Sequence, residues 1–170
     1  MDELIQKLSI LTGSWKGEGS GRYPTIDSFE YEEHLNFELD RSYPLIYYEQ
    51  KTVLMPSEEP GHWETGFIRP LEDGFVEVSN AQEGGRVEVL QGKIETDNSP
   101  EYDLKIVLDS TALGNDPRLI KTRRIWTLKA EYLHYKKYMS TNTTMEPQLL
   151  PHLEATLKRE VEEERSTNFW

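Results

Sequence analysis

Hydrophobic and polar residues alternate along most of this chain, after one short segment with a helical pattern. Residues 2–11 place apolar side chains on one helical face, which predicts a short amphipathic helix. These side chains are Leu4, Ile5, Leu8 and Leu11. Beyond them, aromatic and β-branched residues alternate with polar ones, as expected for half-buried strands. The segments that indicate strands are 27–39, 45–54, 74–80, 86–94, 102–109, 123–129 and 131–139.

Turn-forming residues separate these segments. The turns are PSEEPG at 56–61, EDG at 72–74, EGG at 83–85, DNSP at 97–100 and GNDP at 114–117. Many short strands without intervening helices favour an antiparallel β-barrel or sandwich. A length of 170 residues suits one domain, and no internal repeat or linker divides it. We therefore expect a single domain over residues 1–170, with a solvated acidic tail from about residue 160.

The segment PHLEATLKREVEEER at 151–165 fits two interpretations. Leu153, Leu157 and Val161 recur every four residues, which favours a helix. Over its first half, apolar and polar side chains also alternate, as they would in a strand that closes a barrel. The pattern leaves both interpretations open.

Charge and composition exclude several classes of protein. The chain has 31 acidic and 19 basic residues, a net charge of −12, so nucleic acid is not expected as a partner. The one short basic cluster, residues 121–124, is too small to reverse this. There is no run of 18 apolar residues and no basic, cleavable leader, so we expect neither a membrane span nor a signal peptide. The absence of cysteine excludes disulfides and thiol chemistry and is compatible with a cytoplasmic protein.

Four glycines in GSWKGEGSGRYPTI at 13–26 look at first like a phosphate-binding loop. They have neither the spacing and lysine of a Walker loop nor the spacing of a dinucleotide fingerprint. Pro24 favours an extended backbone before it, so phosphate binding is not expected. Glycines in a strand mark bends or close backbone approach. On one face of a barrel strand they would also leave open space for a broad ligand inside.

The same stretch is similar to the GxWxGxGxGxYPTI opening of the nitrobindin family of haem-binding barrels. Other similar stretches are FEYEE at 29–33, GHWETGFIRP at 61–70, VEVSNAQEGGRVEVLQG at 76–92, YMSTNTT at 138–144 and PHLEATLKR at 151–159. The similarity extends over roughly residues 4 to 159. It implies an all-β fold, a single ten-stranded antiparallel barrel of the lipocalin or fatty-acid-binding-protein type with a short N-terminal helix. One haem b per chain would lie near the barrel mouth.

The resemblance also implies an iron ligand. In this family the iron is held by the histidine that opens the HLxAxLxR segment, which here is His152. A neutral imidazole is a good ligand for haem iron, and this chain has no cysteine to compete with it. Pro151 stiffens the backbone beside His152, and neighbouring leucines supply the apolar surroundings that a porphyrin face needs.

Five more positions match the haem surroundings of the family. The hydroxyl of Thr25 would bond a propionate, and Met139 would pack on the porphyrin. Arg118 and Leu119 would border the open side of the haem, where Arg118 would pair with a propionate. His62 matches a position on the distal or edge side of the pocket. A purely structural role is the alternative at these positions. Thr25 would then be an ordinary strand threonine and Met139 a core methionine. Arg118 would be a solvated arginine at a strand edge, and His62 an exposed turn histidine.

The chain departs from the family pattern beside His62. Gly61 stands where many relatives carry a hydrophobic residue, and the bulky Trp63 follows, so we expect an altered pocket shape. His34 and His134 lie in charged or tyrosine-rich strands and are interpreted as structural or surface residues.

Two other features are expected to be structural. Trp15 should plug the bottom of the barrel. The glutamate runs at 32–33 and 162–164 should be solvated faces rather than acid–base pairs.

The resemblance implies that the chain binds nitric oxide and, with ferric haem, isomerises peroxynitrite to nitrate. A ferric centre held by His152 would act as a Lewis acid for the peroxynitrite anion, and no protein nucleophile is needed. Two alternatives stay open: a carrier of a fatty-acid-like ligand, which would need a basic cluster in the pocket, and a nitric oxide sensor or transporter. The sequence also leaves open a homodimer.

Overall fold

The computed structural model describes residues 3–95 and 100–161, which form a helical segment followed by ten strands. Helix α1 spans Glu3–Leu8 and continues as a 3-10 turn over Ser9–Leu11. The strands are β1 (Gly13–Tyr23), β2 (Ile26–Leu39), β3 (Ile46–Met55), β4 (Pro60–Pro70), β5 (Phe75–Gln82), β6 (Val87–Glu95), β7 (Leu104–Gly114), β8 (Leu119–Lys129), β9 (Tyr132–Thr141) and β10 (Leu150–Arg159). In this part of the chain, no helix is long and apolar enough to cross a bilayer.

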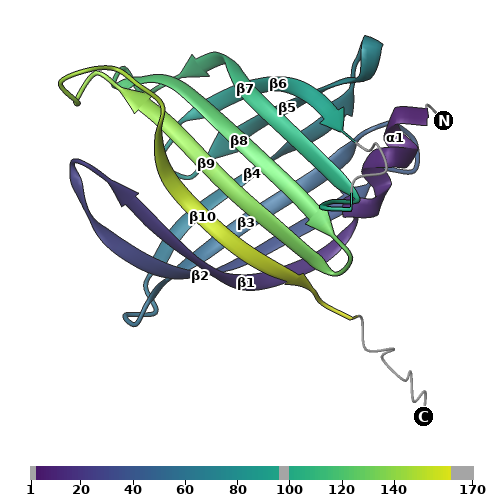
Figure 1. The fold of residues 1–170 in the computed structure, drawn as a ribbon, viewed down its shortest axis with the longest axis horizontal. Helices are drawn as coiled ribbons and strands as arrows, with labels where there is room; N and C mark the ends of the chain where they lie inside the picture. The colour runs from purple at the N-terminus through teal and green to yellow at the C-terminus, as the bar shows by residue number, and fades with distance from the viewer. Residues whose placement is uncertain (1–2, 96–99, 162–170) are drawn as a thin grey trace.

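The strands form a closed antiparallel barrel (Figure 1). Each strand pairs with the next one in the sequence, and β1 also pairs with β10, so the sheet has no free edge. Because each barrel strand has one inner and one outer face, closure turns the period-two pattern into an enclosed interior. The predicted fold class is confirmed.

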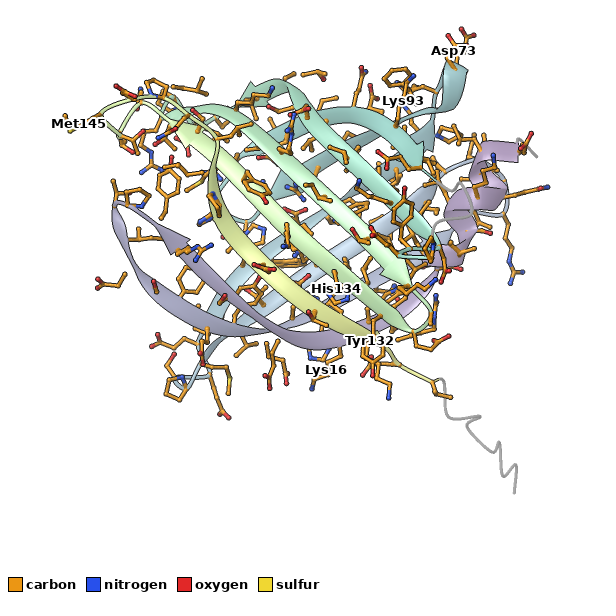
Figure 2. All side chains as sticks on the ribbon, in the orientation of Figure 1. Lys16, Asp73, Lys93, Tyr132, His134 and Met145 are labelled. Carbon is orange, nitrogen blue, oxygen red and sulfur yellow. The ribbon has the colours of Figure 1, made fainter. Side chains whose placement is uncertain are left out.

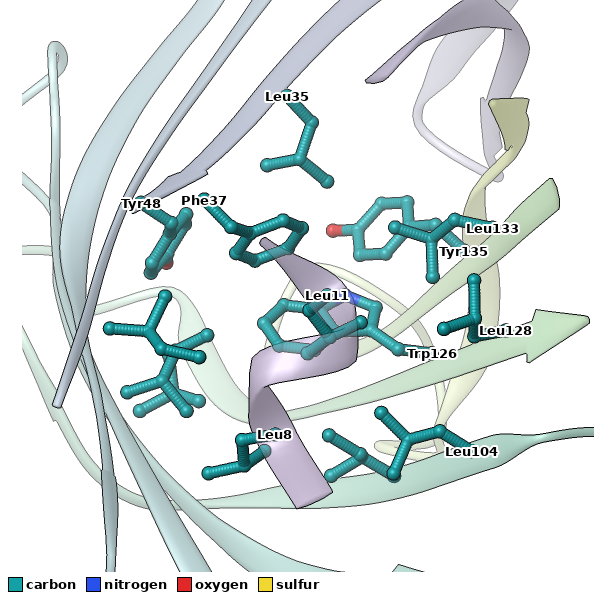
Figure 3. Close-up of a cluster of buried hydrophobic side chains, with 14 of the residues drawn as sticks. Leu8, Leu11, Leu35, Phe37, Tyr48, Leu104, Trp126, Leu128, Leu133 and Tyr135 are labelled. Carbon is teal, nitrogen blue, oxygen red and sulfur yellow. The ribbon is translucent and has the colours of Figure 1, made fainter. Parts of the chain in front are cut away.

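The N-terminal segment covers one end of the barrel (Figure 1). Ile5, Leu8 and Leu11 are fully buried, and Figure 3 shows Leu8 and Leu11 among the side chains of the barrel interior. Trp15 is fully buried as well, and its indole N–H donates to the carbonyl of Leu11 at 2.8 Å. Trp15 therefore fills the end that α1 covers, as predicted.

The ambiguous C-terminal segment is strand β10. It pairs with β1 on one side and β9 on the other, so the strand interpretation is correct and the helical one is wrong. The physical reason is that a helix here would leave the backbone groups of both neighbouring strands unpaired. The strand ends at Arg159, and Glu160 and Val161 are exposed. The tail beyond residue 161, with the glutamate run at 162–164, lies outside the described residues, as does most of the turn predicted at 97–100.

Strand β4, like the glycine-rich β1, was not singled out by the alternation. Its fully buried inner positions include Glu64 and Gly66, whereas the aromatic Trp63 and Phe67 are about half exposed on the outer face. The usual arrangement of apolar inside and polar outside is reversed at Trp63, Glu64 and Phe67. A pattern search for buried strands therefore has little signal here.

The glycines of β1 allow aromatic rings to lie against the strand. Gly19 pairs with Tyr31 and Gly21 with Phe29, and a Cβ atom on either glycine would overlap the facing ring. The space that these glycines leave is thus filled by two rings of β2, and the expectation of open space at this wall is wrong. The glycines serve close approach, which is the other interpretation of the pattern.

Candidate functional site

A cavity of about 380 Å³ is lined by residues at the strand ends opposite α1. The strand ends that surround it are the start of β2, the end of β3 and the start of β4. Its lining residues are Phe29, Tyr31, Gln50, Thr52, Leu54, Gly61, His62, Gln82, Arg86, Tyr135, Lys137, His152 and Leu153. The aromatic and aliphatic side chains make much of the wall apolar. The polar side chains of the lining carry hydroxyl, amide, imidazole, guanidinium or ammonium groups.

His152 reaches this cavity from the start of β10. Its Nδ1 lies 3.2 Å from the backbone carbonyl oxygen of Arg22, to which it donates when the ring is neutral. Burial lowers the pKa of His152 to about 4, although the bond to Arg22 acts in the opposite direction. The imidazole is therefore neutral at physiological pH. Among the described residues no hydrogen bond occupies Nε2, so its lone pair is available to a ligand.

A small apolar cluster adjoins His152. The ring of Tyr23 meets the imidazole edge-on, with centroids 5.9 Å apart at 81°, and its hydroxyl is 3.1 Å from Oγ1 of Thr141. Tyr23 packs with Leu119 and Met139, and all three are buried. The structure thus brings together three of the predicted site residues, His152, Met139 and Leu119, around Tyr23.

Thr25 and Arg118 lie apart from the cavity lining. Thr25 is exposed in the turn between β1 and β2, where it lines a separate cleft with Leu150 and Met145. Figure 2 shows Met145 at the tip of the β9–β10 connection, on the side of the molecule away from α1. Arg118 is exposed and bonds Asp116, with Nε 3.0 Å from Oδ1.

His62 lines the cavity from β4, but carboxylates face both of its nitrogens. Nε2 lies 3.1 Å from Glu64 and Nδ1 lies 3.2 Å from Glu83. His62 is therefore less available to iron than His152. Gly61 also lines the cavity, whereas Trp63 is on the outer surface beneath the ammonium group of Lys51, so its bulk does not narrow the cavity.

The remaining histidines are on the outer surface, as predicted. His34 bonds the carboxylate of Glu32 at 3.1 Å, and Nδ1 of His134 lies 3.1 Å from Oγ1 of Thr156. Figure 2 shows His134 on β9 together with the exposed Lys16 and Tyr132.

A layer of buried charge lies beside the cavity, and sequence analysis missed it. Its members are Glu33, Glu64, Glu88, Arg124 and Lys137, each at most 3% exposed. Arg124 binds Glu64 through both terminal nitrogens and reaches Glu88 at 2.5 Å. Burial acts to raise the pKa of Glu64, but Arg124 holds it well below its ordinary value. Burial also opposes ionisation of Glu88, whose pKa Lys137 and Arg124 lower to about 2. These two carboxylates are therefore ionised.

Glu33 corrects the expectation that residues 32–33 form a solvated face. Glu32 is exposed and bonds Lys16 at 3.0 Å, as expected, but Glu33 is fully buried. Its Oε1 accepts a bond from Gln50 at 2.8 Å, and its Oε2 has no partner among the described residues. Burial raises the pKa of Glu33 to about 8, so this carboxyl group is protonated at neutral pH. Adjacent strand residues face opposite sides, which is why two neighbouring glutamates differ so much.

The donor set at the cavity fits a haem rather than a bare metal ion. Within the described ranges, no three His, Asp or Glu side chains gather to hold a metal ion. A porphyrin already supplies four nitrogens, so one neutral imidazole in an apolar cavity is a sufficient protein ligand. His152, with Nε2 available and Nδ1 anchored, meets that requirement, and its backbone partner fixes the tautomer.

Comparison with known proteins identifies the family of this barrel. A family model described as "THAP4-like, heme-binding beta-barrel domain" matches residues 4–159. The chain belongs to this haem-binding family. The resemblance to nitrobindins is thereby confirmed.

Relatives of this haem-binding barrel carry informative names. A protein named peroxynitrite isomerase Rv2717c from Arabidopsis thaliana is 41% identical over 155 residues, which cover 91% of this chain and 88% of the relative. A peroxynitrite isomerase from Nocardia farcinica is 33% identical over 160 residues, with 92% and 90% covered. The crystal structure of Rv2717c from M. tuberculosis superposes with a TM-score of 0.83 at 30% identity, covering 95% of this chain and 99% of that one.

The structure adds cavity residues that the sequence did not single out. Tyr135 and Lys137 line the cavity from β9, and Arg86 lines it from the turn before β6. Tyr135 and Lys137 are separated from Met139 by even numbers of residues, so all three lie on the same, inner face of β9. The alternation of this strand therefore already indicated that they point inward. Arg86 lies in a turn, where no periodicity indicates a direction.

Proposed function

We propose that this chain binds one haem b through His152 and isomerises peroxynitrite to nitrate at the bound haem. The observation that carries the proposal is His152 itself, a neutral imidazole anchored at Nδ1 with Nε2 available beside an apolar cavity. Membership of a haem-binding family and relatives named peroxynitrite isomerase support it.

The residues of the chain hold and enclose the group. The carbonyl of Arg22 fixes the His152 ring, so that Nε2 rather than Nδ1 is the ligand atom. Apolar side chains such as Phe29, Leu54 and Leu153 would exclude water from a porphyrin face. Bound ferric haem supplies a Lewis-acid centre for the peroxynitrite anion. Binding of nitric oxide to the haem is part of the same proposal.

The pocket cations test the alternative of a fatty-acid carrier. Arg86 and Lys137 line the cavity, as a carboxylate-binding carrier would need. Arg86 bonds Asp116 through one terminal nitrogen and Glu88 lies 3.9 Å from Lys137, so both cations keep donors that a carboxylate could use. The lining is therefore compatible with a carrier, and it is the relatives' names that favour the haem chemistry.

A haem titration tests the first half of the proposal. We expect ferric haem to give a Soret band with wild-type protein and not with His152→Ala. The matched control is His134→Ala, which removes an outer-surface histidine and should titrate like wild type. An identical Soret titration for His152→Ala would contradict the assignment.

Stopped-flow kinetics test the second half. Haem-loaded wild-type protein should accelerate peroxynitrite decay and raise the nitrate yield, compared with haem-free protein. If decay and yield are unchanged while the Soret band forms, the chain is a haem protein without isomerase activity, and a sensor or transporter of nitric oxide becomes the better description.

A further inference from the structure

The lining of the cavity has a charge opposite to that of the whole chain. The chain carries a net charge of −12, yet none of the described residues that line the cavity is acidic. The lining instead includes the cations Arg86 and Lys137. Cations that converge on a low-dielectric cavity attract anions strongly. The lining therefore favours an anionic ligand, although the chain as a whole is acidic.

Lys137 is a buried cation that donates no hydrogen bond to any of the described residues. Its side chain is 4% exposed, and the nearest carboxylate oxygen, Oε1 of Glu88, is 3.9 Å from Nζ, too far for a hydrogen bond. An ammonium group has three donors, which a ligand in the cavity could use. Oε1 of Glu88 is likewise without a partner. Lys137 lines the cavity, so a ligand there can accept its protons.

Arg86 offers a second donor, from the turn before β6. One terminal nitrogen binds Asp116 at 2.5 Å, while its Nε is buried and has no partner among the described residues. The positive charge of Arg86 contributes to lowering the pKa of both Lys137 and His152, after the larger effect of burial. The three groups therefore lie within electrostatic reach of one another.

We propose that Lys137 and Arg86 form a subsite for a small oxyanion within the His152 cavity. Two cations that line one cavity repel one another, and an oxyanion that accepts bonds from the unused donors of both would offset this repulsion. The identification of the natural oxyanion as peroxynitrite or nitrate rests on the proposed function. The subsite itself rests on the lining.

Nitrate is the probe, because it is the stable oxyanion of this class. Its binding to the full chain is measured by isothermal titration calorimetry in a low-chloride buffer, with and without bound haem. Lys137→Met should weaken nitrate binding about tenfold or more, the size expected for a buried charge-assisted bond. The matched control is Lys136→Met, because Lys136 is the preceding residue, faces outward and pairs with Glu154 at 2.9 Å.

A second variant keeps the test decisive if Lys137→Met does not fold. Arg86→Gln removes the other cation and leaves Asp116 paired with Arg118, so no carboxylate loses its last partner. It should weaken nitrate binding to a similar extent. Lys137→Arg keeps the charge and should retain binding.

Three outcomes would overturn the subsite. Nitrate binding could be unchanged in Lys137→Met and Arg86→Gln, or equally weakened in Lys136→Met. Nitrate binding could also vanish when wild-type protein is loaded with haem, which would mean that the haem carboxylates take these cations. Failure of the proposed function is seen separately, as a missing Soret band or unchanged peroxynitrite decay while nitrate binding still depends on Lys137.

Discussion

Burial keeps two side chains near the cavity neutral, one of them a base and the other an acid. Burial lowers the pKa of His152 to about 4 and raises that of Glu33 to about 8. Burial disfavours the charged form, so a base loses its proton and an acid keeps its own. The neutral imidazole is the form that binds iron. The neutral carboxyl of Glu33 avoids a third buried anion beside Glu64 and Glu88.

Glu33→Gln tests the protonation of this carboxyl. From about pH 4.5, where an unfolded glutamate ionises, to about pH 8, only the folded state keeps the proton, so wild-type stability falls as the pH rises. The slope from this group is about 1.4 kcal/mol per pH unit. Glutamine cannot ionise, so the variant should gain stability relative to wild type across this window.

The measurement is urea unfolding at several pH values between 5 and 8. Glu32→Gln is the control, since Glu32 is the exposed neighbour on the other face of β2. Parallel stability curves for wild type and Glu33→Gln would show that Glu33 is ionised when folded.

At the scale of an element, β1 is built for close contact on both sides. On one side, the rings of Phe29 and Tyr31 cover Gly21 and Gly19. On the other side, Gly17 pairs with Leu157 of β10, and a Cβ atom there would overlap the backbone carbonyl of Thr156. The spacing of these glycines therefore matches the positions at which β1 makes close contact with β2 and β10.

Gly17→Ala should therefore destabilise the barrel. The new methyl group meets backbone rather than a movable side chain, and overpacking of this kind costs about 1–3 kcal/mol. Gly84→Ala is the matched control, because no atom lies within 4 Å of an added Cβ in that turn, and a change within about 0.5 kcal/mol is expected. Thermal or urea unfolding measures both. Equal stability of the two variants would contradict this account of closure.

At the scale of the whole molecule, the barrel interior has three layers along its axis. Apolar side chains fill the end beneath α1, among them Leu104, Leu128 and Leu133 (Figure 3). The charged layer follows, and the His152 cavity occupies the far end. Arg124 of β8 connects this middle layer by binding carboxylates of β4 and β6. The charged side chains beside the cavity therefore come from strands that are far apart in the sequence.

Arg124→Met should be strongly destabilising, by about 3–5 kcal/mol, because it leaves Glu64 and Glu88 buried without their main cation. Arg123→Met changes the neighbouring residue, whose partner Asp109 is on the partly exposed outer face, and should cost less than about 1 kcal/mol. Chemical denaturation compares the two variants. Similar losses would mean that the buried network contributes no more than a surface ion pair.

How much the sequence predicted differs between the fold and the site. The strands with alternating patterns were found close to their true positions, and β4 was missed because its aromatic residues face outward. For the site, His152, Leu119 and Met139 were predicted by resemblance and lie together. Thr25, Arg118, Leu119 and Met139 do not line the cavity, and Lys137 does, although no motif indicated it.

The sequence by itself determined the local pattern: one short helix, period-two strands, and glycines where rings and backbone approach. Each of these follows from the pleat of a single strand or the pitch of a single helix, which the nearest neighbours in the chain decide. Only the tertiary structure decided which charges share the interior. Glu64 and Arg124 are 60 positions apart in the chain, and Glu88 and Arg124 are 36 apart. Their pairing depends on barrel closure and on the register between strands, which no local pattern contains.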